Sequence, residues 1–221
     1  NAEHIAGVSA NAAGLDFGFS FNVVTRTDDG NSQGTLRRFL NNSITVTGAN
    51  VMRFVPAVPT NAANGPDTWW RTDVGASLPV ISDVSTTVDG TAYDLVDGST
   101  VLNPNDANLG VVRAVGRTGA YTTPELDPEL EIHGTNAIPY GLDVQAGSAA
   151  IRNISIWGFG DYLPAPVEAV IRVGVNSSSA FVAPTIEQNV VGTNPASFVD
   201  PGVGPRSGGH LIQLLGVDDG I

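Results

Sequence analysis

The sequence predicts an all-β protein, a single-stranded parallel β-helix, and three observations lead to this fold class. Residues 129–160 contain three short runs in which apolar and polar residues alternate: Leu130–Ile132, Leu142–Val144 and Ile151–Trp157. Such alternation is typical of strands with one buried face. Gly, Asn, Pro and Ser separate the runs, as in tight turns. Comparable runs recur further along the chain, which favours coils that stack one on the next.

Composition limits the possible partners. The chain of 221 residues has a net charge of −12, and its ten basic residues are all arginines. This balance disfavours nucleic acid and anionic membrane surfaces, because no basic patch is available to neutralise phosphates. The absence of cysteine excludes disulfides and thiolate chemistry. No apolar stretch is long enough for membrane insertion. A sparsely charged, acidic surface is typical of an exposed protein that attracts divalent cations.

Residues 1–24 hold the clearest single strand signal, an extra N-terminal strand ahead of the coils. One face of residues 12–24 carries Leu15, Phe17, Phe19, Phe21 and Val23. Large apolar side chains on one face need a surface to pack against. We expect them to cover the protein's own core or to end an upstream β-sandwich module. The alternative is an exchanged strand that assembles subunits by strand addition.

Residues 25–56 predict a segment that caps the first coil. Its expected elements are a turn at Asp28–Asn31, an N-cap at Thr35, a helix with the apolar face Leu36, Phe39 and Leu40, a helix end at Asn41–Asn42, and a strand at Val51–Phe54 before Pro56. A small amphipathic helix in this place covers the open end of a strand stack and its unpaired edge.

The turn of the capping segment is also a candidate calcium site. Asp28, Asp29 and Asn31 lie within four residues, a spacing at which oxygen ligands converge around a turn. The Gly and Glu positions of an EF-hand are missing. The three histidines, His4, His133 and His210, are scattered and predict no metal site. We expect no cofactor other than this possible calcium ion.

The capping segment resembles a known family. The run DDGNSQGTLRRFLNN, followed by a strand ending in RF, is similar to the "NTNDSGxGSLRQAI" opening of large bacterial surface proteins. Residues 78–91, 141–159 (GLDVQAGSAAIRNISIWGF) and 185–193 (TIEQNVVGT) resemble later motifs of that family in the same order. The resemblance covers roughly residues 14–56, 78–91 and 130–221. It implies right-handed coils, a secreted or cell-surface location, and no common catalytic residues.

Residues 57–129 are expected to form the first coils, with long loop insertions. Trp69 and Trp70, followed by Arg71, fall in an irregular stretch at 57–77. Adjacent indoles in a loop can stack on sugar rings while Arg71 bonds hydroxyls, which would make a carbohydrate-binding module. The alternative is that one indole fills the end of the core and the other lies on the outside of the coil. Residues 92–128 predict a long loop of functional or contact character.

Residues 130–221 are expected to be repeating rungs that end in mid-coil. One row aligns Leu142–Val144 with Ile171–Val173 and with Leu211–Leu214. A second row aligns Ile151–Ile154 with Thr185–Gln188 and begins again at Ile221. Nothing in the sequence closes the end after residue 210. We therefore expect this end to meet another subunit or further residues of a longer chain.

A polysaccharide-active enzyme is the main alternative function. Polygalacturonase-like and lyase-like β-helices use paired carboxylates or a basic residue beside bound calcium. The candidates here are Arg152, Arg172, Asp143 and Asp161. Asp218–Asp219 is better explained as a turn, and Gly208–Gly209–His210 precedes it in the wrong order. We therefore favour an extracellular structural protein, such as a surface-layer, fibre or adhesin component, over an enzyme.

Overall fold

The computed structural model describes residues 21–106, 127–135, 137–160, 168–174, 181–182, 184–197, 199–215 and 217–218. Within these ranges strands dominate, and α1 (Leu36–Thr45) is the one helix. The predicted all-β class is confirmed at this level.

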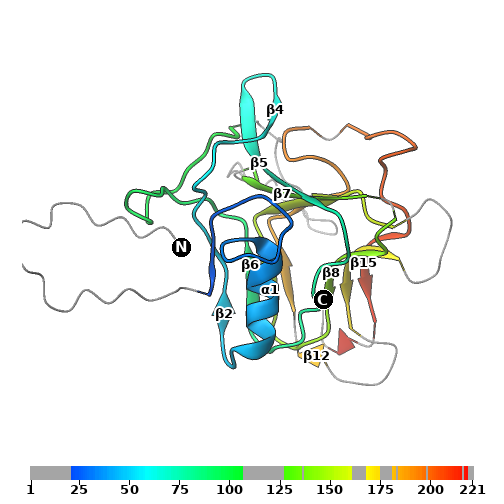
Figure 1. Ribbon diagram of the computed structural model, residues 1–221. Helices are drawn as coiled ribbons and strands as arrows, with labels where there is room; N and C mark the ends of the chain where they lie inside the picture. The colour runs from blue at the N-terminus through cyan, green and yellow to red at the C-terminus, as the bar shows by residue number, and fades with distance from the viewer. Residues whose placement is uncertain are drawn as a thin grey trace, which may run out of the picture.

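Most strands belong to three sheets, each made of parallel neighbours apart from one antiparallel edge (Figure 1). The first sheet is β2 (Asn50–Val51), β6 (Thr86–Asp89), β9 (Ala150–Arg152) and β13 (Thr185–Glu187). The second is β5 (Asp67–Val74), β7 (Leu130–Gly134), β10 (Ile154–Trp157) and β14 (Val190–Val191), with β4 (Ala62–Asn64) antiparallel to β5. The third is β8 (Tyr140–Val144), β11 (Ala169–Val173) and β15 (His210–Leu214). Two further parallel pairs join β1 (Val23–Val24) to β3 (Arg53–Phe54), and β12 (Phe181–Val182) to β16 (Val217–Asp218).

The chain visits the three sheets in a recurring order. It passes through β6, β7 and β8, then β9, β10 and β11, then β13, β14 and β15. We call each such set of three strands a coil, and the last set the terminal coil. Every strand of a later coil pairs in parallel with the equivalent strand of the coil before it.

The predicted row through the third sheet is confirmed, and its alignment is confirmed for the first two strands. Ile171 pairs with Leu142 on one side and with Ile212 on the other, and Val173 pairs with Val144 and Leu214. The third run therefore aligns from Ile212, one residue after its predicted start at Leu211. All the members before the terminal coil lie in the core.

The predicted row through the first sheet is correct, but its alignment is wrong by one residue. Ile151 pairs with Ile186, whereas the sequence alignment placed it opposite Thr185. Ile221, the proposed third member, lies outside the described residues. A shift of one residue exchanges the two faces of a strand, so burial of Ile151 selects the observed register.

The run Ile151–Trp157 is two strands, which corrects the prediction of one. Asn153 separates β9 from β10 with φ 55°, a left-handed conformation that breaks the strand and turns the chain into the next sheet. Its side-chain amide donates hydrogen bonds to Asp89 Oδ1 (3.0 Å) and Thr91 Oγ1 (2.9 Å). Gln188 has φ 54° at the same corner of the terminal coil. The corner thus repeats from coil to coil.

The capping helix forms at the predicted start but runs past the predicted end. Thr35 is the N-cap, and its hydroxyl accepts a hydrogen bond from the Arg38 N–H at 3.2 Å. The helix continues through Asn41–Asn42 to Thr45, because Asn42 is buried and donates to the Phe21 carbonyl (3.3 Å). Leu36, Phe39 and Leu40 are buried as predicted. They belong to one core with the inward residues of the coils.

Two further strand predictions need correction. The expected strand Val51–Phe54 is split at Met52 between β2 and β3, which pair with different partners. Of the long N-terminal strand, the described part shows only β1, after a turn at Phe21–Asn22. Phe21 itself is half exposed, while Phe17 and Phe19 lie outside the described residues.

Candidate assembly surface at the terminal coil

The terminal coil exposes apolar side chains that are buried in every earlier coil. Ile212 and Leu214 on β15 are 43% and 42% exposed, whereas their register partners Ile171 and Val173 on β11 are both 0% exposed. Leu211, which lies beside Val191, is 48% exposed. The exposed side chains therefore occupy positions that a further coil would cover.

The backbone of the terminal coil is also open. Among the described residues, β13 pairs only with β9, β14 only with β10, and β15 only with β11. Each of these strands therefore has one edge without a described partner strand. Edge strands of this kind are templates for pairing with another strand, especially when their side chains are apolar. Figure 1 shows β15 at the opposite side of the molecule from β2 and α1.

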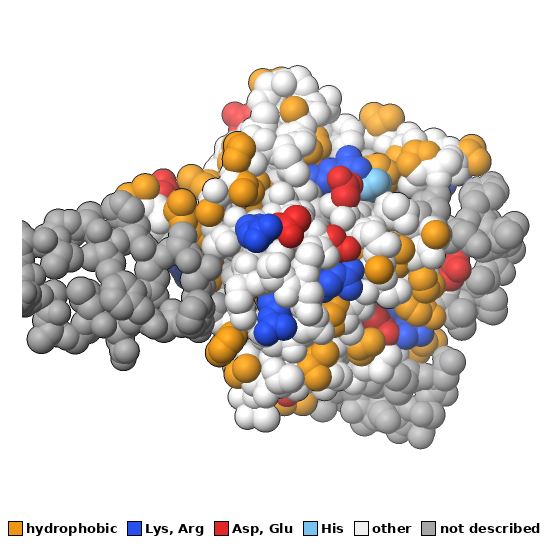
Figure 2. Space-filling model, viewed as in Figure 1, with side chains coloured by type: hydrophobic (Ala, Val, Ile, Leu, Met, Phe, Trp, Pro, Cys, Tyr) orange, Lys and Arg blue, Asp and Glu red, His pale blue; other side chains and the backbone are white. Residues whose placement is uncertain are grey.

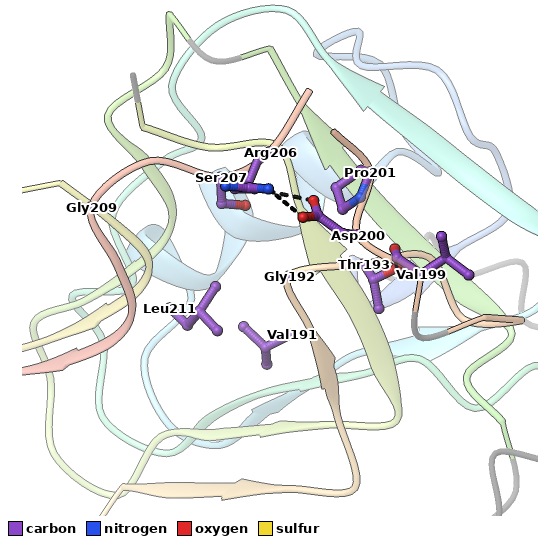
Figure 3. Close-up of a pocket in the computed structure, with 10 residues that line it drawn as sticks. All are labelled: Val191, Gly192, Thr193, Val199, Asp200, Pro201, Arg206, Ser207, Gly209 and Leu211. Carbon is purple, nitrogen blue, oxygen red and sulfur yellow. Dashed lines mark hydrogen bonds and ion pairs between the residues drawn. The ribbon is translucent and has the colours of Figure 1, made fainter. Parts of the chain in front are cut away.

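A pocket of about 450 Å³ lies between β14 and β15 (Figure 3). Val191 and Leu211 lie together on one side of it, and the ion pair of Asp200 with Arg206 lies on the other. The loop that carries this ion pair includes Val199, which is strongly exposed. The hydrogen bond from Arg206 lowers the pKa of Asp200, and the Gly202 N–H adds to this effect. The pocket extends the apolar surface of β15 towards β14.

The predicted calcium residues are held by separate partners. Arg26 bonds Asp28, and Asn41 donates to Asn31 Oδ1 at 2.9 Å. Asp29 accepts from Arg37 (Nη2 to Oδ2, 2.9 Å) and from the Gly75 N–H (2.9 Å). These contacts tie the cap to the end of β5. Among the described residues, no group of three or more acidic or histidine side chains is placed to hold a metal. Calcium binding at this turn stays a prediction.

The tryptophan pair is placed differently from the loop that the sequence predicted. Trp69 and Trp70 lie within β5 and are 3% and 6% exposed. The Trp70 indole N–H donates to the Val58 carbonyl at 2.8 Å, and its ring meets Phe54 edge-on. Arg71 bonds Asp73 and His133. Neither indole presents a free face on which a sugar could stack. The predicted carbohydrate-binding role is therefore corrected: both indoles pack in the interior.

The four residues proposed for catalysis do not form one site. Arg172 bonds Asp143, its register partner on β8, and stacks over the Tyr140 ring at 3.7 Å. The hydrogen bonds to Asp143 raise the pKa of Arg172, which keeps this guanidinium protonated and unable to accept a proton from a substrate. Arg152 belongs to a different sheet and pairs with Asp89 at 2.9 Å. Asp161 lies outside the described residues.

Basic and acidic side chains lie next to one another across the face seen in Figure 2, without a large patch of either sign. The ion pairs of the described residues include Arg26–Asp28 and Arg37–Asp29. Most of the described arginines are thus used in pairs with carboxylates of the same chain. The face seen in Figure 2 presents no cationic groove for a polyanionic ligand.

Sequence reasoning missed a set of buried acids beside the second sheet. Glu131 is fully buried and accepts hydrogen bonds from the indole N–H groups of Trp69 and Trp157. Burial raises the pKa of Glu129 to about 8. Burial likewise raises the pKa of Asp127 to about 7, helped by the charges of Asp67 and Asp106. Both oxygens of Asp127 lack a hydrogen-bond partner in the described structure. The sequence of a strand does not indicate which of its acidic residues will be buried.

Comparison with known proteins adds no further constraint. No family model, no curated protein and no solved structure matches this chain. Among the described residues, no helix is long and apolar enough to cross a bilayer. The candidate site therefore depends on the geometry of the terminal coil.

Proposed function

We propose that this chain is a right-handed, single-stranded parallel β-helix that serves as an extracellular structural protein and self-associates through its terminal coil. Three features of the fold support this proposal. The three sheets are visited in one order, the pairings between coils are parallel, and the polar corner at Asn153 recurs at Gln188. A stack with these features is stiff and adds length without new loops, which suits a surface layer, a fibre or an adhesin stalk.

One observation carries the self-association. The inward positions of β15 are more than 40% exposed, whereas the same positions of β11 are fully buried. Soluble monomers rarely leave contiguous apolar residues on an open strand edge, because such edges aggregate. The other end of the stack is closed by α1, whose apolar face lies in the core. We infer that a second copy of the chain covers this end, because one repeated contact then buries the exposed residues of every subunit in the assembly except the last.

The distribution of charge supports a structural role over catalysis. The arginines that a lyase would need are held in ion pairs, and Asp127 and Glu129, whose pKa values are raised, are buried. A secreted or cell-surface location follows from the resemblance to bacterial surface proteins and agrees with the acidic, cysteine-free composition.

The assembly is tested by measuring mass against concentration. We expect light scattering after size exclusion to show a mass that rises with concentration, and negative-stain microscopy to show linear assemblies. Ile212→Asp should lower association, because it places a charge in the contact. Val96→Asp is the matched control, since Val96 is 70% exposed on a loop away from the terminal coil. A wild-type chain that stays monomeric at all concentrations contradicts the proposal.

The location is tested independently of assembly. Antibody labelling of intact producing cells should detect the chain if it is at the surface. Labelling that appears only after the cells are opened would contradict an extracellular role.

A further inference from the structure

The open edge of β15 requires a partner with a defined pattern. Ala169, Ile171 and Val173 on β11 are fully buried, and they pair with His210, Ile212 and Leu214. Ile171 and Val173 belong to the hydrophobic core, so Ile212 and Leu214 continue a row of inward positions. A segment that continues this row must be extended, with large apolar residues at every second position and small or polar residues between them.

The chain contains such a segment close to its N-terminus. In residues 15–19 the inward positions would be Leu15, Phe17 and Phe19, with Asp16 and Gly18 between them. The polar residues would face solvent while the three apolar side chains cover the row of β15. The turn at Phe21–Asn22 follows this segment and leads directly into β1. The pocket beside Leu211 offers further space for a large ring next to the added strand.

We propose that the terminal coil accepts residues 15–19 of a second copy as an added parallel strand along β15. This inference rests on the proposed function, because it names the segment through which self-association occurs. Main-chain hydrogen bonds to the open edge would supply affinity, and the alternate apolar side chains would supply register.

Chain length excludes the same copy as the donor. The first sheet spans three strand-to-strand steps from β2 to β13, about 14 Å at ~4.8 Å a step. Because β1 lies one step before this stack and the added strand one step beyond it, about 24 Å separates them. Four peptide units from Phe19 to Val23 reach at most about 14 Å. Strand addition therefore joins different copies, head to tail.

The geometry also determines the form of the assembly. The donor segment precedes β1, which pairs with β3, whereas the acceptor edge is β15, so the two surfaces differ and the contact is heterologous. Heterologous contacts that do not close into a ring produce open linear polymers. Each added subunit presents a new β15 edge, so growth continues in one direction.

The first test removes the apolar side chains of the donor segment. The double variant Phe17→Asp and Phe19→Asp should raise the concentration of half-assembly by more than about 100-fold, because two aromatic side chains lose their burial. Asp16→Asn serves as the control, since its side chain would face solvent, and it should leave assembly unchanged. A double variant that still assembles like the wild type overturns the inference while leaving self-association itself in place.

The second test uses the absence of native cysteine. In the proposed register Gly18 lies opposite Gln213, between the pairs Phe17–Ile212 and Phe19–Leu214. A mixture of Gly18→Cys chains and Gln213→Cys chains should form a disulfide between copies under mild oxidation. A mixture of Gly18→Cys and Val96→Cys chains should not. Absence of the first disulfide in assembled protein overturns the inference, whereas absence of any assembly by the wild type overturns the proposed function.

Discussion

β11 and β15 are neighbouring strands of one sheet with the same alternation of side chains, yet their environments are opposite. Ile171 on β11 is inaccessible to solvent, while its register partner Ile212 on β15 is nearly half exposed. Among the described strands, β11 has a paired strand on both sides and β15 has one on a single side. Alternation thus marks which face turns inward, but only a following coil buries that face.

The largest effect is expected from truncating the same residue type in the two strands. Ile171→Ala should lower the free energy of unfolding by about 2–5 kcal/mol, because it leaves a cavity in the core. Ile212→Ala should cost about 0.5 kcal/mol in the dilute monomer, as is usual for surface positions. Urea unfolding followed by circular dichroism measures both. Equal losses would show that β15 is covered in the monomer and would remove the contrast.

The next largest effect is a pH dependence of stability that is expected from Asp127 and Glu129. The folded-state pKa of Asp127 is raised from 3.8 to about 7, so its contribution to stability is present below pH 3.8 and is lost as pH rises towards 7. Glu129, with a pKa of about 8, extends this loss to higher pH. We expect the urea concentration at the unfolding midpoint to decrease as the pH is raised from 4 to 8. Asp127→Asn should flatten this dependence and stabilise the protein at pH 8.

Asp200 of the terminal coil provides the control for that measurement. Its pKa is lowered by the hydrogen bond from Arg206, so its contribution is present above pH 3.8 and is lost only as pH falls below that value. Asp200→Asn should leave the slope between pH 4 and pH 8 unchanged. A slope that is unchanged in Asp127→Asn, or one that disappears in Asp200→Asn, would contradict the assignment, whereas the part that Glu129 contributes should remain in both variants.

A smaller effect is expected from the two ion pairs. Arg172→Ala should cost about 1–3 kcal/mol, because it leaves the buried Asp143 carboxylate unpaired and removes the stacking on Tyr140. Arg206→Ala should cost about 0–1 kcal/mol, because Arg206 and Asp200 are both exposed. Thermal unfolding of the two variants at the same salt concentration compares them directly. A larger loss for Arg206 would mean that its loop is a structural part of the stack.

Much of the fold was accessible from the sequence because its signals are local. The Thr35 N-cap and the face Leu36, Phe39 and Leu40 depend on spacing within one helix, and both are found. The alignment of Leu142 with Ile171 was found because both coils keep the same alternation.

The errors have long-range causes. The break at Asn153 depends on hydrogen bonds to Asp89 and Thr91, which are more than sixty residues away. The burial of Trp69 depends on Glu131, which lies on the neighbouring strand of the second sheet. The local sequence around these residues does not include their partners. For this reason Trp69 and Trp70 were assigned to a loop, and the break between β9 and β10 was not predicted.

The sequence by itself determined where strands form and which side chains turn inward, because period-two alternation is a property of each strand alone. Only the tertiary structure decided the register of the first sheet, the corner at Asn153 and the difference between Ile171 and Ile212. Each of these depends on the residues that pack beside a strand. Those residues are distant in the sequence, so the pattern of one strand does not reveal them. The exposure of Ile212 is the clearest case, since β15 has the same alternation as the buried strand β11.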